Sequence, residues 1–334
     1  MRSETIDYIN IALLIISFIA AIFLPFELFL FSYAFLGPLH YLTEINWLDD
    51  KKYFIKSKSQ AYIAFIIFAA IIAIYPLIKY LDYNNEFFNV ISSKKNVILL
   101  IGFMFSVSLI IFTKAKQLIL AFAFSALFSV ICFLYIPKIV LALGVFLPTL
   151  IHVYVFTLLF MIYGQLKHYS NAGLICVILL IVFPITLLFM DLVPESYMIS
   201  DFAKSTYIAS GFLSINNTIA GLFGNLNTSN FGLMSSIIVK VQVFIAFAYT
   251  YHYLNWFSKT SIIGWKASLS SSRMKYIVFL WICSVGLYLY DYVTGLIALF
   301  FLSLLHVVLE FPLNITTIKE IGLAVVKKLN LRSN

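Results

Sequence analysis

Long apolar stretches separated by short polar ones dominate this chain. Each stretch is close to the length of about 20 residues that a helix needs to cross the hydrocarbon core of a bilayer. Strands of a membrane barrel would alternate polar and apolar residues, whereas these stretches are apolar on all sides. The pattern therefore predicts an all-α, polytopic transmembrane helical bundle of about ten spans, in a single domain over residues 1–334. The predicted spans are 8–24, 27–47, 60–80, 96–113, 117–136, 139–163, 173–190, 234–256, 275–291 and 295–314.

The composition agrees with a surface that meets lipid. Hydrophobic residues make up 63% of the chain and charged residues 11%, against about 25% charged residues in an ordinary soluble domain. The net charge of +8 would also suit a nucleic-acid partner, but the basic residues gather in short loops between spans, which is the orientation signal of a membrane protein. We therefore expect no nucleic-acid partner, membrane lipid as the surroundings, and a multi-pass location in a bacterial inner (cytoplasmic) membrane.

Basic residues also predict the orientation of the chain. With ten spans, the Lys- and Arg-containing segments 48–59, 114–116, 257–274 and the C-terminal tail all fall on one side, which places both termini in the cytoplasm. Lys94 and Lys95 are the exception. The long polar stretch 191–233 then becomes a non-cytoplasmic loop, expected to hold a short interfacial helix around 207–213. A loop of this length is typical of a lid or of a plain connector.

Four of the five histidines lie inside predicted spans. They are His40, His152, His252 and His306, whereas His168 follows Lys167 in a turn. Their spans are the second, sixth, eighth and tenth, which all run from outside to inside. Each histidine lies past or near the middle of its span, so the four side chains fall in one layer of the membrane, where they could converge.

Two of these histidines have an acid four residues further on, Glu44 after His40 and Glu310 after His306. Positions i and i+4 share a helix face, so each pair could bind one metal, or the acid could orient the ring. An ionised carboxylate inside the membrane costs several kcal/mol unless it is paired, which makes both acids candidate catalytic residues. Tyr251, next to a histidine, is a third. Structural helix–helix hydrogen bonds, haem ligation and a proton relay are the other interpretations of these polar residues.

Imidazole and carboxylate together predict a metal centre. This ligand set is usual for non-haem Fe(2+) and also accommodates Zn(2+). Iron with open positions activates dioxygen, whereas zinc activates water, and apolar surroundings favour the first. The expected partners are therefore a lipid-soluble small molecule and dioxygen, and the predicted activity is that of a membrane oxidoreductase. A proton-coupled secondary transporter that uses the same His and Glu residues, or a membrane acyl- or prenyl-transferase, are the alternatives.

The order of these motifs resembles a known family. Pro38-Leu-His40 with Glu44, Ile151-His152, Tyr249-Thr-Tyr-His252 and His306 with Glu310 are similar to the histidine motifs of the membrane-integral β-carotene cleavage dioxygenases of the Brp/Blh type. The resemblance implies a non-haem iron site held by the four histidines and cleavage of a carotenoid-like polyene by dioxygen. It covers these four motifs, and Trp256 stands where the family has a further histidine.

Overall fold

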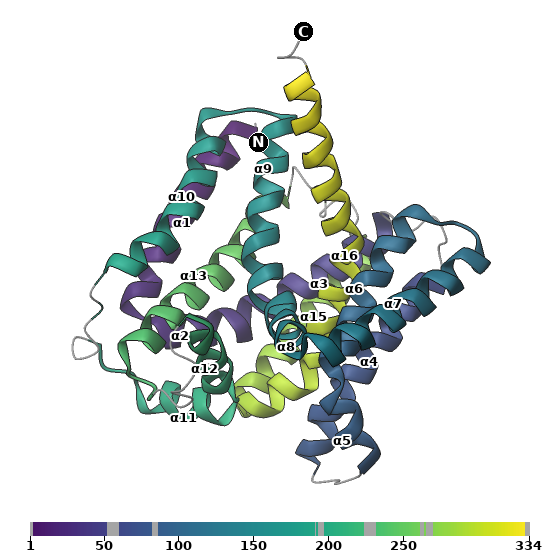
Figure 1. Cartoon of the computed structure of the whole chain (residues 1–334). Helices are drawn as coiled ribbons and strands as arrows, with labels where there is room; N and C mark the ends of the chain where they lie inside the picture. The colour runs from purple at the N-terminus through teal and green to yellow at the C-terminus, as the bar shows by residue number, and fades with distance from the viewer. Residues whose placement is uncertain are drawn as a thin grey trace. The chain divides into compact units, whose positions relative to one another are not determined.

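The structure is a computed structural model that describes residues 3–51, 60–81, 86–190, 192, 197–223, 232–260, 264 and 270–330. Within these ranges every regular element is a helix and no strand occurs (Figure 1). The predicted all-α class is therefore confirmed. The loop segments 52–59 and 265–269, which carry several of the basic residues behind the predicted orientation, lie outside the described residues, and the orientation stays a prediction.

Eight of the described helical segments are long and apolar enough to cross a membrane. They are α1 (Ser3–Phe23), α4 (Gln60–Tyr80), α7 (Ala115–Tyr135), the continuous run of α8 (Pro137–Phe146), η2 (Leu147–Phe156) and α9 (Thr157–Lys167), α10 (Asn171–Phe189), α13 (Ser236–Ser258), α15 (Ser271–Tyr290) and α16 (Tyr292–Asn330). The other two predicted spans are also helical, one as α2 (Pro25–Phe31), η1 (Ser32–Leu36) and α3 (Gly37–Lys51), the other as α6 (Lys95–Ile111). The chain is a polytopic, all-helical protein of the integral membrane class.

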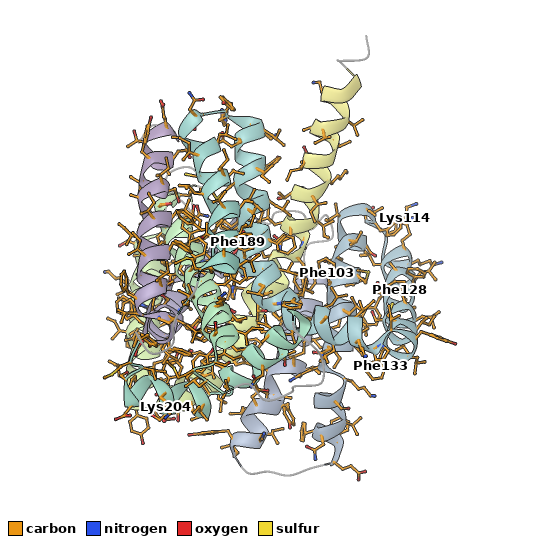
Figure 2. The ribbon with its side chains drawn as sticks, turned by 60° about the vertical axis from the view of Figure 1, so that its left-hand side comes forward. Phe103, Lys114, Phe128, Phe133, Phe189 and Lys204 are labelled. Carbon is orange, nitrogen blue, oxygen red and sulfur yellow. The ribbon has the colours of Figure 1, made fainter. Side chains whose placement is uncertain are left out.

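Apolar side chains cover the outer faces of these helices. On α7, Ile119 and Leu120 are 70% and 73% exposed, and Phe189 at the end of α10 is 83% exposed. Sticks along the helices are mostly carbon, and the labelled Lys114 lies at the start of α7 (Figure 2). Such a surface would be unfavourable in water but suits contact with lipid chains.

Local sequence explains where several helices begin. Pro25 and Pro137 are the first residues of α2 and α8, a position where the missing N–H has no intrahelical partner to lose. Ser170 caps α10 by accepting from the Gly173 N–H, and Asp291 accepts from the N–H and hydroxyl of Thr294 at the start of α16. These hydrogen bonds lower the pKa of the exposed Asp291 carboxyl, so the residue is a helix cap, as its place between two spans suggests.

The described residues form two compact units. The first comprises 1–40, 167–267 and 272–296, the second 41–166, 268–271 and 297–334. In the first unit α1, α10 and α13 lie side by side, and α2 packs on α13 (Figure 1). In the second unit α6 packs against α7 and α8, and α5 (Glu86–Ser93) follows α4. The helices α3 and α16 each contribute residues to both units.

The polar stretch 191–233 holds two helices where one was predicted. These are α11 (Asp201–Ala209) and α12 (Phe212–Phe223). Gly211, with φ of +75°, makes the turn between them, because glycine adopts this left-handed conformation without a steric penalty. The helix expected around 207–213 is thus divided at its centre between α11 and α12, and its interfacial position stays a prediction. Residues 224–231 lie outside the described part of the chain.

Gln242 joins these two helices to the rest of the first unit. Its side chain on α13 is fully buried. Its carbonyl oxygen accepts from the Tyr207 hydroxyl at 2.5 Å and the Asn216 amide at 3.0 Å, and its own NH₂ donates to the Pro25 carbonyl at 2.9 Å. One amide therefore holds α11, α12 and α2 against α13.

Replacing Gln242 by Leu should loosen this part of the fold. The change leaves three buried polar partners unpaired, each at a cost of roughly 1–3 kcal/mol. We expect a clearly lower unfolding temperature in detergent and faster proteolysis within α11 and α12. Tyr207→Phe, which removes a single hydrogen bond, should give a smaller effect, and Lys204→Ala on the exposed face of α11 should give none. Equal unfolding temperatures for all three variants would contradict the assignment.

Candidate metal centre

All four histidines predicted as ligands are buried in helices. His40 lies on α3, His152 on η2, His252 on α13 and His306 on α16. His168 is exposed in the turn after α9, as expected for a solvated residue. Four imidazoles are therefore buried within helices, and the fifth, that of His168, is exposed.

Two of these helices widen into π-helical turns at or just before a histidine. The segment η1 ends with a hydrogen bond from the Gly37 N–H to the Ser32 carbonyl, directly before α3, and η2 contains His152. Pro38 and Pro148, near the two segments, cannot donate the regular helical hydrogen bond. Each extra residue in a turn rotates the following side chains by about 100°, and such turns are frequent at functional sites.

In the first unit, His40 and His252 face each other. Their Nε2 atoms lie 3.1 Å apart. Two further rings of α13 contact His40. The ring centroid of Tyr253, next to His252, lies 5.1 Å from that of His40, and the ring centroid of Trp256, one turn further on, lies 5.5 Å from it. Gly37 leaves room for this packing, because a Cβ there would lie 3.3 Å from the Tyr253 hydroxyl. Trp256 is therefore a buried neighbour of the histidines.

Aromatic rings continue from this pair toward α12. Tyr253 contacts Tyr249 at 6.1 Å between centroids, Tyr249 contacts Phe29 at 5.3 Å, and Phe29 contacts Phe212 at 4.9 Å. These rings pack edge to face, the favoured arrangement of their quadrupoles. The packed rings keep water away from the His40–His252 pair on this side.

In the second unit, His152 and His306 form a similar pair. Their Nε2 atoms are also 3.1 Å apart, and the Tyr41 ring stacks beside His306 at 5.9 Å. The Nδ1 atom of His152 lies 2.6 Å from the Glu310 carboxylate. That negative charge favours a proton on Nδ1, which leaves the Nε2 lone pair free to bind a metal.

This contact changes the predicted role of Glu310. The i+4 spacing put Glu310 on the face of its own helix neighbour, His306, whereas its carboxylate contacts the imidazole of η2. In this position the Glu310 carboxylate could orient the His152 ring, whereas the spacing had related it to His306. Its catalytic role stays a prediction. Glu44 is buried as well, and its carboxylate interacts electrostatically with that of Glu310.

The spacing of the ring nitrogens is compatible with a hydrogen bond and with a shared metal ion. With metal–nitrogen bonds of about 2.0–2.1 Å, two neighbouring imidazole nitrogens on one ion are separated by roughly 2.9–3.4 Å, which includes the observed 3.1 Å in both pairs. Each pair lies within one unit, His40 with His252 in the first and His152 with His306 in the second. Either pair could contribute two nitrogens to a metal ion.

Tyr251, the third candidate catalytic residue, lies against α1. Its hydroxyl donates to the Asn10 side-chain oxygen at 3.3 Å, and its ring stacks on Phe247. Its catalytic role stays a prediction. Tyr41 and Tyr253, which contact the histidines, do not stand out in the sequence from the other tyrosines of the chain. The signal for Tyr253 was Gly37, a small residue one turn before His40, which admits a large ring.

Comparison with known proteins leaves this geometry as the main guide. No protein-family model matches the chain, and the searches of curated proteins and of solved structures find no match. The resemblance to the carotene-cleaving dioxygenases therefore rests on the four histidine motifs alone.

Substitution of Glu310 tests whether it orients His152. Glu310→Gln keeps the shape but removes the negative charge, so the Nδ1 proton is held less firmly. We expect the affinity for Co²⁺, followed by its visible absorption, to fall about 10–100-fold, the usual effect of losing such a partner. Glu320→Gln, further along α16, should leave the affinity unchanged. An unaltered affinity and spectrum in Glu310→Gln would show that the carboxylate does not orient the ligand.

Proposed function

We propose that this protein is a metal-dependent membrane oxidoreductase, with non-haem iron as the metal and a lipid-soluble molecule as the substrate. The observation that carries the proposal is the second-unit pair, in which two buried imidazoles face each other at 3.1 Å and a carboxylate holds the far nitrogen of one of them. A buried carboxylate and facing ring nitrogens are costly without a cation or proton between them. A bound divalent ion would supply that charge.

The residues around the histidines support an oxidation of an apolar compound. Iron bound there would activate dioxygen, the second substrate in this proposal. Tyr253 and Trp256 pack on His40, and Tyr41 packs on His306, so the imidazoles have aromatic surroundings that would suit an apolar molecule. Such a molecule would approach from the bilayer, in which it dissolves. A carotenoid-like polyene is the substrate that the motif resemblance suggests, and Zn(2+) remains the alternative metal.

A proton-coupled secondary transporter is the second candidate. The observation in its favour is the pair of buried carboxylates, Glu44 and Glu310, whose charges interact. Carboxylates of this kind inside a membrane protein are typical of proton relays. A transporter would need these carboxylates for activity but would bind no stoichiometric transition metal.

Metal content separates the two candidates. We expect the detergent-purified protein to hold about one or two equivalents of iron, and we expect His40→Ala, His152→Ala and His306→Ala each to lose it. His252→Ala should lose it as well, because His252 faces His40 in the first-unit pair. His168→Ala, an exposed histidine, is the matched control. Elemental analysis that finds no metal in the wild-type protein would exclude the metal enzyme and favour transport, and zinc in place of iron would favour hydrolysis.

Dioxygen consumption tests the chemistry itself. With β-carotene in detergent, the iron-loaded protein should consume dioxygen and release aldehydes that carry ¹⁸O from ¹⁸O₂. The His152→Ala variant should do neither, because it lacks a ligand. Binding of the polyene without uptake of dioxygen would contradict the oxidoreductase and leave only a lipid-binding site.

A further inference from the structure

Asn314 on α16 is a buried amide without a partner. Its side chain is fully buried, and neither its oxygen nor its nitrogen has a hydrogen-bond partner among the residues that the structure describes. An amide removed from water without compensation costs roughly 1–3 kcal/mol in proteins. An apolar residue at this position would avoid that cost, and a ligand with a polar group would offset it by supplying the hydrogen bond.

The position of Asn314 relates it to the candidate metal centre. It lies four residues after Glu310 and eight after His306, so the three side chains share one face of α16. At a rise of 1.5 Å per residue, Asn314 is about 12 Å from His306 along the helix axis. Phe311, also fully buried, packs on Phe103 of α6 beside this face, and Phe103 is labelled in Figure 2. One buried aromatic pair thus lies close to this part of α16.

The expected depth of Asn314 in the membrane suggests what kind of ligand it could bind. Asn314 follows Tyr292, the first residue of α16, by 22 positions, or about 33 Å of helix. The hydrocarbon core is about 30 Å thick, so Asn314 would lie at its far boundary in a span that begins at Tyr292. Polar end groups of amphiphilic molecules lie at this depth, while their apolar bodies extend inward.

We propose that Asn314 binds the oxygen-containing end of an amphiphilic substrate, a hydroxyl or carbonyl group, whose apolar body runs along α16 toward His306. The proposal rests on the proposed function for the presence of a lipid-soluble substrate, and it adds the class of that substrate. The amide can donate to a carbonyl and can both donate to and accept from a hydroxyl. This hydrogen bond would make Asn314 a residue that determines specificity, because it would favour an oxygenated compound over the corresponding hydrocarbon.

Two matched probes test this proposal in metal-free protein. The probes are β-carotene and β-cryptoxanthin, which differ by one hydroxyl, and binding is measured by quenching of tryptophan fluorescence in nanodiscs. We expect the hydroxylated probe to bind about 10-fold more tightly, because only it pairs with the buried amide. In Asn314→Leu the two affinities should become equal within about 2-fold. Thr316→Val is the control, since the Thr316 hydroxyl is already bonded within the helix to the Pro312 carbonyl, and it should keep the preference.

Stability provides a second readout. Because Leu removes an unpartnered buried amide, the unliganded variant should unfold at the same temperature as wild type or higher. If the larger side chain prevents folding, Asn314→Ala has the same expected loss of preference without the added volume. Equal binding of both probes to wild type, or a preference that survives in the folded variants, would mean that water alone satisfies Asn314 and would overturn the proposal.

The outcome is separable from that of the metal test. If the wild-type protein holds iron but shows no preference between the probes, the substrate inference fails and the metal centre stands. If the preference is present but no metal is bound, the site binds an amphiphilic lipid and the oxidoreductase proposal fails.

Discussion

Two helical segments of the second unit, η2 and α16, meet where the His152 imidazole contacts the Glu310 carboxylate. In water this contact would contribute little, but in hydrocarbon an unpaired carboxylate costs several kcal/mol. The depth and rotation of η2 and α16 are therefore constrained together, because a shift of either would leave the charge without its partner. The facing of His152 and His306 depends on that constraint, since the imidazole held by Glu310 can present only its other nitrogen.

The π-helical turns show how an apolar helix can place a polar residue. Rotation of a lipid-facing helix changes its free energy little, because most of its faces are equally apolar. An added residue in a turn redirects the following side chains without changing the composition of the span. The segment η2 contains His152, and η1 ends four residues before His40; each histidine belongs to a facing pair. A polytopic membrane protein can thus build a polar centre while keeping a lipid-compatible exterior.

Other polar residues of the first unit join its helices to one another. Gln242 of α13 is hydrogen-bonded to residues of α11, α12 and α2. The Glu27 carboxylate of α2 accepts from the Ser200 N–H, directly before α11, at 3.0 Å. Between these bonds and the His40–His252 pair lies the row of aromatic rings. In the first unit, the hydrogen bonds of Gln242 and Glu27 are therefore separate from the imidazole pair.

Sequence alone determined the helical class and the histidines that belong inside the membrane, because hydrocarbon excludes every other backbone arrangement of such apolar segments and makes each buried polar residue conspicuous. It did not determine which side chains meet. Glu310 shares a face with His306 by spacing, yet its carboxylate contacts His152, and the break at Gly211 divides a helix that the pattern placed there. Pairing across helices depends on their relative rotation, which π-helical turns change and which apolar periodicity cannot report, because these helices are apolar on nearly every side. Only the tertiary structure could decide it.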